Sequence, residues 1–150
     1  MYKYILLLLL SLNLYSTPTQ LSLELIKKHE GLRLVAYKDS KGMSIGYGTN
    51  LSYITKKEAE YLLRSRLYMI DLELTRSYEW YTKLPYIPKS IVIDMVYNLG
   101  LTRFSKFLKL HRHLEANNWV KSALEMKDSV WYRQVGLRGK YLYKMMVNYN

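Results

Sequence analysis

Cysteine is absent from all 150 residues of this chain, so neither disulfides nor thiolate chemistry can contribute to its stability or its function. The sequence also lacks internal repeats and, beyond its first residues, low-complexity tracts. Its hydrophobic fraction of 49% and charged fraction of 23% are those of an ordinary globular protein. The length is that of one domain, which must be held together by packing alone.

Long apolar runs are lacking too, because the one at the N-terminus, residues 5–14, is too short to span a bilayer comfortably as an ordinary helix. A single positive charge, Lys3, precedes it and a small polar stretch follows, which is typical of a secretory signal peptide. We expect residues 1–16 to be a signal peptide, or a signal-anchor in transient membrane contact, with cleavage near Thr17 favoured over retention. Residues 17–150 would form one domain of an exported protein, periplasmic or secreted.

Negative charge is scarce, since 23 Lys and Arg stand against 12 Asp and Glu and the formal net charge is +11. Such a charge attracts polyanions, among them cell-wall polymers, anionic lipid and nucleic acid, without choosing among them. The 16 tyrosines suit stacking on single-stranded nucleic acid, but no nucleic-acid-binding motif accompanies them. We therefore expect no specific nucleic-acid partner.

A metal site is not expected either. His111 and His113 are two residues apart, and side chains with that spacing point to different sides of a helix. No cluster of Asp, Glu or Cys lies near them in the sequence to complete a ligand set. We expect a surface or partly buried structural role for both histidines.

Two carboxylates stand close together in the sequence, Glu30 and, nine positions on, Asp39. The i, i+4 spacing of apolar residues over 21–30 predicts a short helix that ends at Glu30, because Gly31 follows. The alternation over residues 33–47 predicts a hairpin that turns just after Asp39. Taken singly, each carboxylate is more often structural than catalytic.

Together, the two carboxylates indicate a specific chemistry. The negative end of a helix dipole favours the proton-bearing form of a carboxyl, whereas a carboxyl in a wet turn stays ionised. Hydrolysis of a glycosidic bond uses such a pair, since one carboxyl protonates the leaving oxygen and the other activates water or stabilises the oxocarbenium-like transition state. The pattern therefore favours a glycosidase with Glu30 as its acid and Asp39 as the second carboxylate.

The same stretch resembles the active-site signature of the phage-type lysozymes, or endolysins, of glycoside hydrolase family 24. In that signature a Glu is followed after eight residues by an Asp and after five more by a Thr, just ahead of a Gly-rich strand. Here GLRLVAYK separates Glu30 from Asp39, and IGYG at residues 45–48 matches the strand. Ser44 takes the place of the Thr, but four residues instead of five separate it from Asp39. Strand alternation would turn it to the opposite face unless the turn absorbs the deletion.

The resemblance extends over most of the chain. IVIDMVYNLG, residues 91–100, is similar to the family's helix beneath the cleft, with Asn98 in the place of its amide residue, although an amide there can equally satisfy helix-end carbonyls. SVWYRQVGLRGK, residues 129–140, is similar to a Trp-Tyr segment followed by an Arg that pairs with the catalytic Glu. The resemblance thus implies a pair between Arg138 and Glu30, whereas a solvated surface charge is the commoner role of an Arg.

Helical signals dominate the chain beyond the hairpin. A capping box that starts at Thr55 opens a long helix, Pro88 falls in the first turn of another that Gly100 ends, and apolar residues within 104–114 and 119–126 predict two more. The fold class expected is α+β, mainly α. It would be lysozyme-like, with a small β-hairpin lobe joined by a long helix to a larger helical lobe.

The resemblance implies a monomeric muramidase that hydrolyses the β-1,4 bonds between N-acetylmuramic acid and N-acetylglucosamine in peptidoglycan, with inversion and without metal or organic cofactor. Glu30 would be the general acid, Asp39 would steer the attacking water, and Ser44 would hold that water. Asn98 and Arg138 would support them. Two alternatives remain, a glycosidase for another polysaccharide such as chitin and a catalytically impaired protein that only binds the wall.

Overall fold

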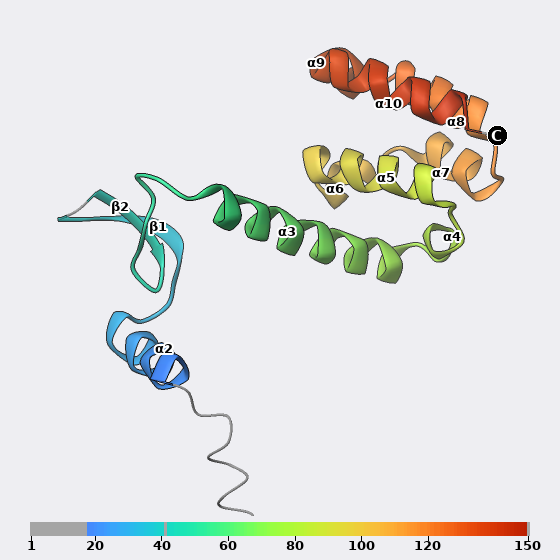
Figure 1. Ribbon diagram of the computed structural model, residues 1–150. Coiled ribbons are helices and arrows are strands. Elements are labelled where there is room, and N and C mark those ends of the chain that lie inside the picture. Colours follow the sequence, from blue (N-terminus) through green and yellow to red (C-terminus); the bar gives the residue numbers. More distant parts are fainter. Residues whose placement is uncertain (1–17, 41, 150) are drawn as a thin grey trace, which may run out of the picture. The chain divides into compact units, whose positions relative to one another are not determined.

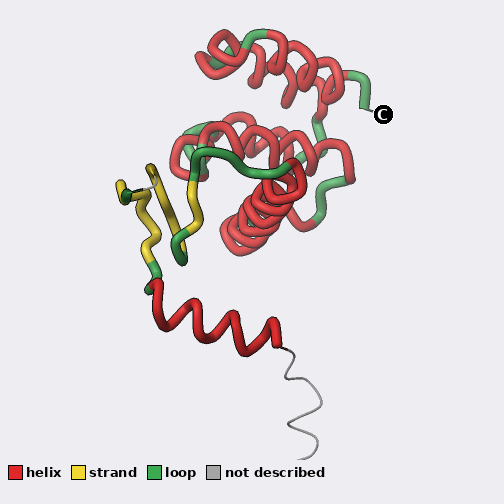
Figure 2. Tube along the Cα trace, turned by 60° about the vertical axis from the view of Figure 1, so that its left-hand side comes forward, coloured by secondary structure: helices red, strands yellow, loops and turns green. Residues whose placement is uncertain are grey.

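The computed structural model describes residues 18–40 and 42–149, so the expected signal segment, residues 1–16, lies outside the described residues. The chain forms two compact units, one up to Lys56 and the other from Lys57 onward. All strands formed by the described residues belong to the first unit, and the second unit is helical (Figures 1 and 2). The predicted α+β, mainly α, fold class is therefore confirmed.

The first unit begins with helix α2 (Pro18–Glu30). Gly31 follows it with φ +67°, and the Gly31 N–H donates to the Lys27 carbonyl over 3.2 Å. Glycine reaches this left-handed conformation without the steric cost of a side chain, which is why helices commonly end at such a residue. The prediction of a helix that ends at Glu30 is confirmed.

Three antiparallel strands follow in the order β1 (Arg33–Asp39), β2 (Gly42–Gly46) and β3 (Thr49–Asn50). In the β1–β2 pair Asp39 opposes Gly42 and Tyr37 opposes Ser44, which confirms the predicted hairpin. On its other edge β2 pairs with β3, where Ser44 opposes Asn50. Ser44 thus occupies the central strand, between Tyr37 and Asn50.

The second unit opens with α3 (Lys56–Ser77), which starts directly after Thr55 as predicted. The remaining helices are α4 (Glu79–Thr82), α5 (Tyr86–Leu99), α6 (Leu101–Phe104), α7 (Leu108–Glu115), α8 (Trp119–Lys127), α9 (Val130–Val135) and α10 (Leu137–Val147). The helix predicted from the apolar residues of 104–114 is interrupted, because α6 stops at Phe104 and α7 starts only at Leu108. Within the described residues, no helix combines the length and the apolar character needed to cross a membrane.

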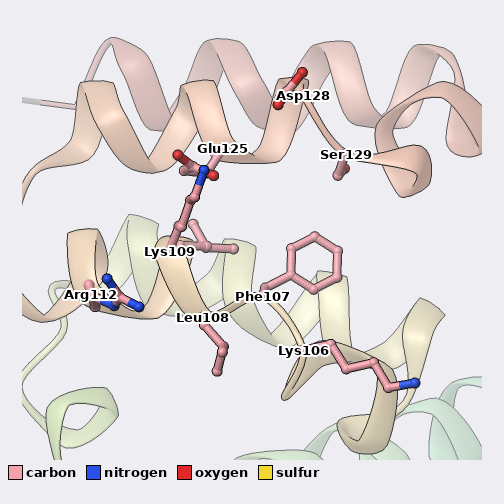
Figure 3. Close-up of a pocket in the computed structure, with 9 residues that line it drawn as sticks. Lys106, Phe107, Leu108, Lys109, Arg112, Glu125, Asp128 and Ser129 are labelled. Carbon is pink, nitrogen blue, oxygen red and sulfur yellow. The ribbon is translucent and has the colours of Figure 1, made fainter.

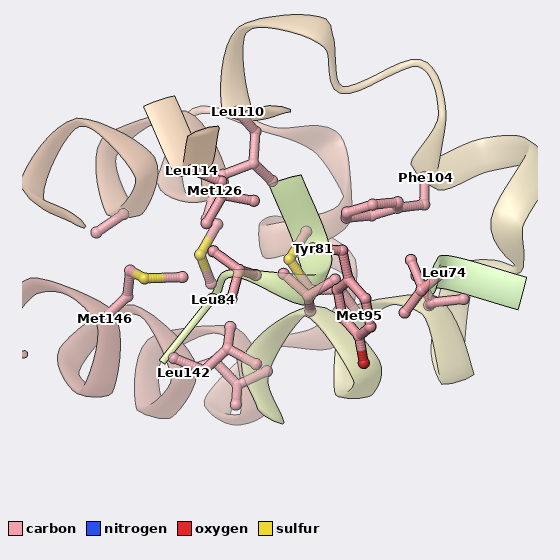
Figure 4. Packing of buried hydrophobic residues seen from close by; sticks show 14 of the residues in the cluster. Leu74, Tyr81, Leu84, Met95, Phe104, Leu110, Leu114, Met126, Leu142 and Met146 are labelled. Atoms are coloured by element: carbon pink, nitrogen blue, oxygen red, sulfur yellow. The ribbon is translucent and has the colours of Figure 1, made fainter. Parts of the chain in front are cut away.

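Apolar side chains from helices of the second unit meet in one core (Figure 4). Its fully buried members include Leu74 of α3, Tyr81 of α4, Met95 of α5 and Met146 of α10. Burying a side chain of this size stabilises the folded state by about 1.5–3 kcal/mol. The core therefore holds the end of α3 against the helices that follow. The Tyr81 hydroxyl is satisfied inside this core by donating a hydrogen bond to Asp71 of α3.

Candidate active site

Asp39 and Ser44 are brought together on neighbouring strands of the first unit. Ser44 Oγ donates a hydrogen bond to Asp39 Oδ2 over 2.6 Å. Ser44 is 1% exposed and Asp39 is half-buried, so the bond is shielded from competing water. A hydroxyl-to-carboxylate bond of this length is charge-assisted and stronger than one between neutral groups. The carboxylate is therefore held in one orientation by the hydroxyl.

The pairing of β1 with β2 explains why Ser44 faces Asp39. Directly opposed residues of an antiparallel pair point to the same face of the sheet, and so do residues two apart on one strand. Because Tyr37 opposes Ser44 and Asp39 lies two residues after Tyr37, the side chains of Asp39 and Ser44 share a face. Ser44 therefore faces Asp39, although one residue fewer separates them than in the family signature.

The Glu30 carboxyl lies against Gly48, in the turn between β2 and β3. A Cβ on Gly48 would stand 3.3 Å from Glu30 Cδ and 2.9 Å from Glu30 Oε2, and the second distance is shorter than real Cβ atoms approach other atoms. The φ of Gly48 is +76°, in the left-handed region. The backbone conformation favours glycine here, and a side chain at this position would displace the carboxyl. Glu30 is exposed, as a group that meets a substrate must be.

Asn98 belongs to the second unit, where it joins two helices. Its Oδ1 accepts a hydrogen bond from Trp131 Nε1 over 2.9 Å, which links α5 to α9. Trp131 is 3% exposed, and a buried indole N–H needs such an acceptor. The structure therefore gives Asn98, at the C-terminal end of α5, a partner in the Trp131-Tyr132 segment.

Arg138 forms an ion pair with Asp94 of α5. Arg138 Nε donates to Asp94 Oδ1 over 2.7 Å, and Nη2 donates to the Asp94 carbonyl over 3.3 Å. The two side chains are 37% and 35% exposed, so the pair adds at most about 1 kcal/mol and mainly fixes the guanidinium direction. Arg138 is therefore not a freely solvated charge. Its pairing with Glu30, which the family resemblance implies, remains a prediction.

The Asp94–Arg138 pair forms part of the wall of a pocket of about 520 Å³ within the second unit. The other lining residues are mainly apolar and come from α3 and α5: Leu63, Leu67, Ser90, Ile93 and Tyr97. An apolar wall with a few fixed polar groups is the usual composition of a ligand site. Arg138 is the predicted site residue that lies in this wall.

A further pocket of about 470 Å³ lies between α7 and α8 (Figure 3). Cations line its α7 side and carboxylates its α8 side, and the charged residues are Lys106, Lys109, Arg112, Glu125 and Asp128. Figure 3 shows Lys109 reaching up toward Glu125. The predicted site residues are not among those that line this pocket.

His111 is a core residue of the second unit. Its ring packs against Tyr78, Trp80 and Phe104, and Nε2 lies 3.1 Å from the Phe104 carbonyl oxygen. Burial lowers the pKa of His111, and the hydrogen bond with the Phe104 carbonyl opposes that shift. Among the residues that the structure describes, no three His, Asp or Glu side chains gather closely enough to hold a metal ion.

Sequence reasoning missed Gly48 and Asp94. Gly48 ends the IGYG match, but the sequence shows only that a glycine is there and not that a carboxyl from α2 rests on it. Asp94 lies four residues before Asn98, on the same face of one helix, and this i, i+4 spacing is a signal that could have identified it. The partner of Ser44 on its other side, Asn50, belongs to a two-residue strand too short to give a pattern.

Comparison of the sequence with known proteins found one family model and several relatives. The family model described as phage lysozyme matches residues 27–146, a range that contains every predicted site residue. The chain is similar to a Dictyostelium discoideum protein named probable T4-type lysozyme 1, with 27% identity over 143 residues, 74% of this chain and 84% of that relative. It is also similar to probable T4-type lysozyme 2 of that organism, with 33% identity over 58 residues, 39% of this chain and 34% of that relative.

Proposed function

Because this chain belongs to the phage lysozyme family and is a glycoside hydrolase, we propose that it is a muramidase that hydrolyses the β-1,4 bonds between N-acetylmuramic acid and N-acetylglucosamine in peptidoglycan. The observation that carries the proposal is the hydrogen bond from Ser44 to Asp39, in the same compact unit as Glu30. It supports a carboxylate and a hydroxyl that act on one water molecule. Cell-wall lysis would be the biological outcome.

In the proposed mechanism Glu30 is the general acid. Its exposed carboxyl at the end of α2 delivers a proton to the glycosidic oxygen as the bond to the anomeric carbon breaks. The proton is the only group that Glu30 must transfer in this step. Gly48 leaves the room in which the carboxyl can sit while it does so.

Asp39 and Ser44 then orient the attacking water. The Ser44 proton is already committed to Asp39 Oδ2, so Ser44 Oγ can only accept hydrogen bonds from other groups. A water that donates one proton to Ser44 and the other to Asp39 presents its lone pair to the anomeric carbon. Asp39 takes up the proton that the water releases, and its negative charge stabilises the oxocarbenium-like transition state.

Attack by water on the face opposite the leaving group inverts the anomeric centre. Inversion requires the two carboxyls to be about 6.5–9.5 Å apart, whereas a covalent intermediate requires about 5–5.5 Å. We propose inversion, with Arg138 and Asn98 as supporting residues. Arg138, oriented by Asp94, would help to direct the Glu30 carboxyl, and Asn98 would fix Trp131.

Glu30→Gln tests the proposal, because the amide keeps the shape of the side chain but cannot supply an acidic proton. Cleavage of purified peptidoglycan, measured in a zymogram and by turbidity, should fall by at least about 10²–10⁴-fold. Glu24→Gln is the matched control, since Glu24 lies on the same helix and is exposed in contact with Lys27. Equal activity of Glu30→Gln and the wild type would exclude the mechanism.

The same assay separates the alternatives. Cleavage of chitin in preference to peptidoglycan would favour a glycosidase for another polysaccharide. Binding to the wall without any cleavage, in the wild type as in Glu30→Gln, would favour an impaired wall-binding protein.

We also propose that the protein is exported and works as a monomer on anionic cell wall. The N-terminal apolar run and the net charge of +11 support this. N-terminal sequencing of the secreted form should give a start near Thr17, and a membrane-held form that still starts at Met1 would favour the anchored alternative. Binding to the wall should weaken as added salt shortens the Debye length below about 8–10 Å, whereas binding unaffected by salt would argue against a role for the charge.

A further inference from the structure

We propose that Asn50 is a positioning residue for the Asp39–Ser44 pair, and that the NH₂ half of its carboxamide holds the Ser44 hydroxyl proton on Asp39. The inference rests on the proposed function, in which this pair orients the attacking water. The juxtaposition that carries it is the placement of Asn50 directly across from Ser44 in the sheet.

Asn50, Ser44 and Asp39 lie on one face of the sheet. Ser44 of the central strand opposes Asn50 on β3, and directly opposed residues of antiparallel strands have Cβ atoms about 4.5–5.5 Å apart on the same side. Ser44 reaches Asp39 on the other edge of that strand through its 2.6 Å hydrogen bond. Asn50 is half-buried, in keeping with a side chain that lies over the sheet. Ser44 is thus flanked by a carboxylate on one side and an amide on the other.

The direction of the amide is set by the backbone. The Ser52 N–H donates to Asn50 Oδ1 over 2.8 Å, and a backbone N–H can only donate, so the atom that it meets is the oxygen. The NH₂ group is then at the other end of the amide, and Nδ2 lies 3.8 Å from the point that a Cβ on Gly42 would occupy. Because Gly42 is paired with Asp39, Nδ2 is directed to the part of the sheet that carries the pair.

An amide NH₂ group beside a hydroxyl has a defined effect on it. Its hydrogens carry partial positive charge, so they repel the hydroxyl proton and attract the oxygen lone pairs. The Ser44 O–H is thereby disfavoured from turning toward Asn50 and favoured toward Asp39. In the proposed mechanism this keeps a lone pair of Ser44 available to accept from the attacking water, and the water in turn stays aligned.

The two halves of the amide can be tested separately. Asn50→Ser retains a side-chain oxygen that can accept from the Ser52 N–H, as Ser does in such turns, but it has no NH₂ group. Asn50→Asp also retains that oxygen and the shape of the side chain. Thr49→Ser is the matched control, because Thr49 is the neighbouring residue of β3, is exposed and opposes Ile45 instead of Ser44. Thermal unfolding and the kinetics of peptidoglycan cleavage are measured for each variant.

We expect Asn50→Ser to unfold at the wild-type temperature and to lose about 10-fold or more in kcat, with KM within twofold, because a misaligned water lowers the rate without weakening substrate binding. Asn50→Asp should lose at least as much. In the Ser44→Ala background Asn50→Ser should have no further effect, since there is no hydroxyl left to position. A wild-type kcat for Asn50→Ser, or an equal loss in both backgrounds, would overturn the inference.

Failure of the inference is distinct from failure of the proposed function. A wild-type enzyme that cleaves peptidoglycan, with Glu30→Gln inactive and Asn50→Ser fully active, leaves the function intact and refutes the role of Asn50. If the wild type does not cleave the wall, the proposed function fails. The coupling between Asn50 and Ser44 is then measured from the free energies of unfolding of the single and double variants. Additive effects of Asn50→Ser and Ser44→Ala on unfolding would then contradict the inference, and non-additive effects would support it. Should Asn50→Ser not fold, Asn50→Asp replaces it with the same expected results.

Discussion

Gly48→Ala is expected to separate catalysis from stability, because the methyl group that it adds meets the Glu30 carboxyl. The new Cβ would stand 2.9 Å from Glu30 Oε2, whereas ordinary van der Waals contact begins near 3.4 Å. The carboxyl must therefore move by roughly half an ångström to one ångström, and as the far end of a flexible side chain it can do so at little cost to the fold. Its position over the turn is lost.

The loss of stability and the loss of rate in Gly48→Ala have separate causes. Holding a residue with a Cβ at φ +76° costs about 1–2 kcal/mol, which lowers the free energy of unfolding by that amount. Displacing an acid by about 1 Å from the atom that it must protonate can cost about 10²-fold in rate. We therefore expect kcat to fall by about 10²-fold for Gly48→Ala, with KM little changed, while most of the protein stays folded at 25 °C.

Gly46→Ala is the control that isolates the loss of rate caused by displacing the Glu30 carboxyl. Gly46 has nearly the same backbone, with φ +69°, but a Cβ there would meet nothing within 4 Å. Both variants should lose similar thermal stability in a calorimetric or circular-dichroism melt, and Gly46→Ala should keep near wild-type kcat on purified peptidoglycan. If both variants have the same kcat, the Glu30 carboxyl does not rest on Gly48 in the working enzyme and the reasoning is wrong.

Three further predictions concern single side chains. Ser44→Ala should lower kcat by about 10²-fold, in the range of acid–base contributions. Ser44→Thr should keep a measurable rate because threonine also carries the hydroxyl. An unchanged kcat in Ser44→Ala would show that the hydroxyl does not reach the water. Burial raises the pKa of Tyr81, and Asp71 adds a smaller rise. The stability that the folded protein gains from the neutral Tyr81 phenol is therefore complete below pH 10 and is lost as the pH rises above it. Between pH 9 and 11 the melting temperature should therefore fall more steeply for the wild type than for Tyr81→Phe. Parallel curves of melting temperature against pH would contradict this. Burial lowers the pKa of His111, so the stability of the protein should decline as the pH falls below about 6.5, where the unfolded chain takes up the proton first. From pH 7 to 4.5 the melting temperature should decline less for His111→Gln than for the wild type. An identical slope would contradict the lowered pKa of His111.

Local signals in the sequence were sufficient for most elements. The end of α2 at Glu30, the hairpin around Asp39 and the start of α3 after Thr55 each depend on a glycine, a turn or a cap that acts within a few residues. The interruption between α6 and α7 was not predictable in this way. Its apolar residues fit a helical spacing, and no local signal marks Phe104, which is fully buried in the core of the second unit, as the end of α6.

The candidate site shows the same division between local and non-local information. Spacing indicated Glu30 and Asp39 as candidates, and the resemblance to the family signature added Ser44. Neither decided whether Ser44 faces Asp39, because that depends on how the two strands pair. The partners Gly48 and Asp94 are set by tertiary contacts, one with a carboxyl from another element and one with a guanidinium 44 residues away. No pattern within a single segment records such contacts.

The chemical identity of the reducing ends in a peptidoglycan digest tests the muramidase proposal most directly. Purified peptidoglycan is digested with the wild-type protein and with Glu30→Gln, the products are reduced with borohydride, and the reduced sugars are identified by mass spectrometry. The proposal predicts reduced N-acetylmuramic acid at the new chain ends with the wild type, and no new ends above background with Glu30→Gln. Reduced N-acetylglucosamine at those ends, or equal products from both proteins, would contradict it.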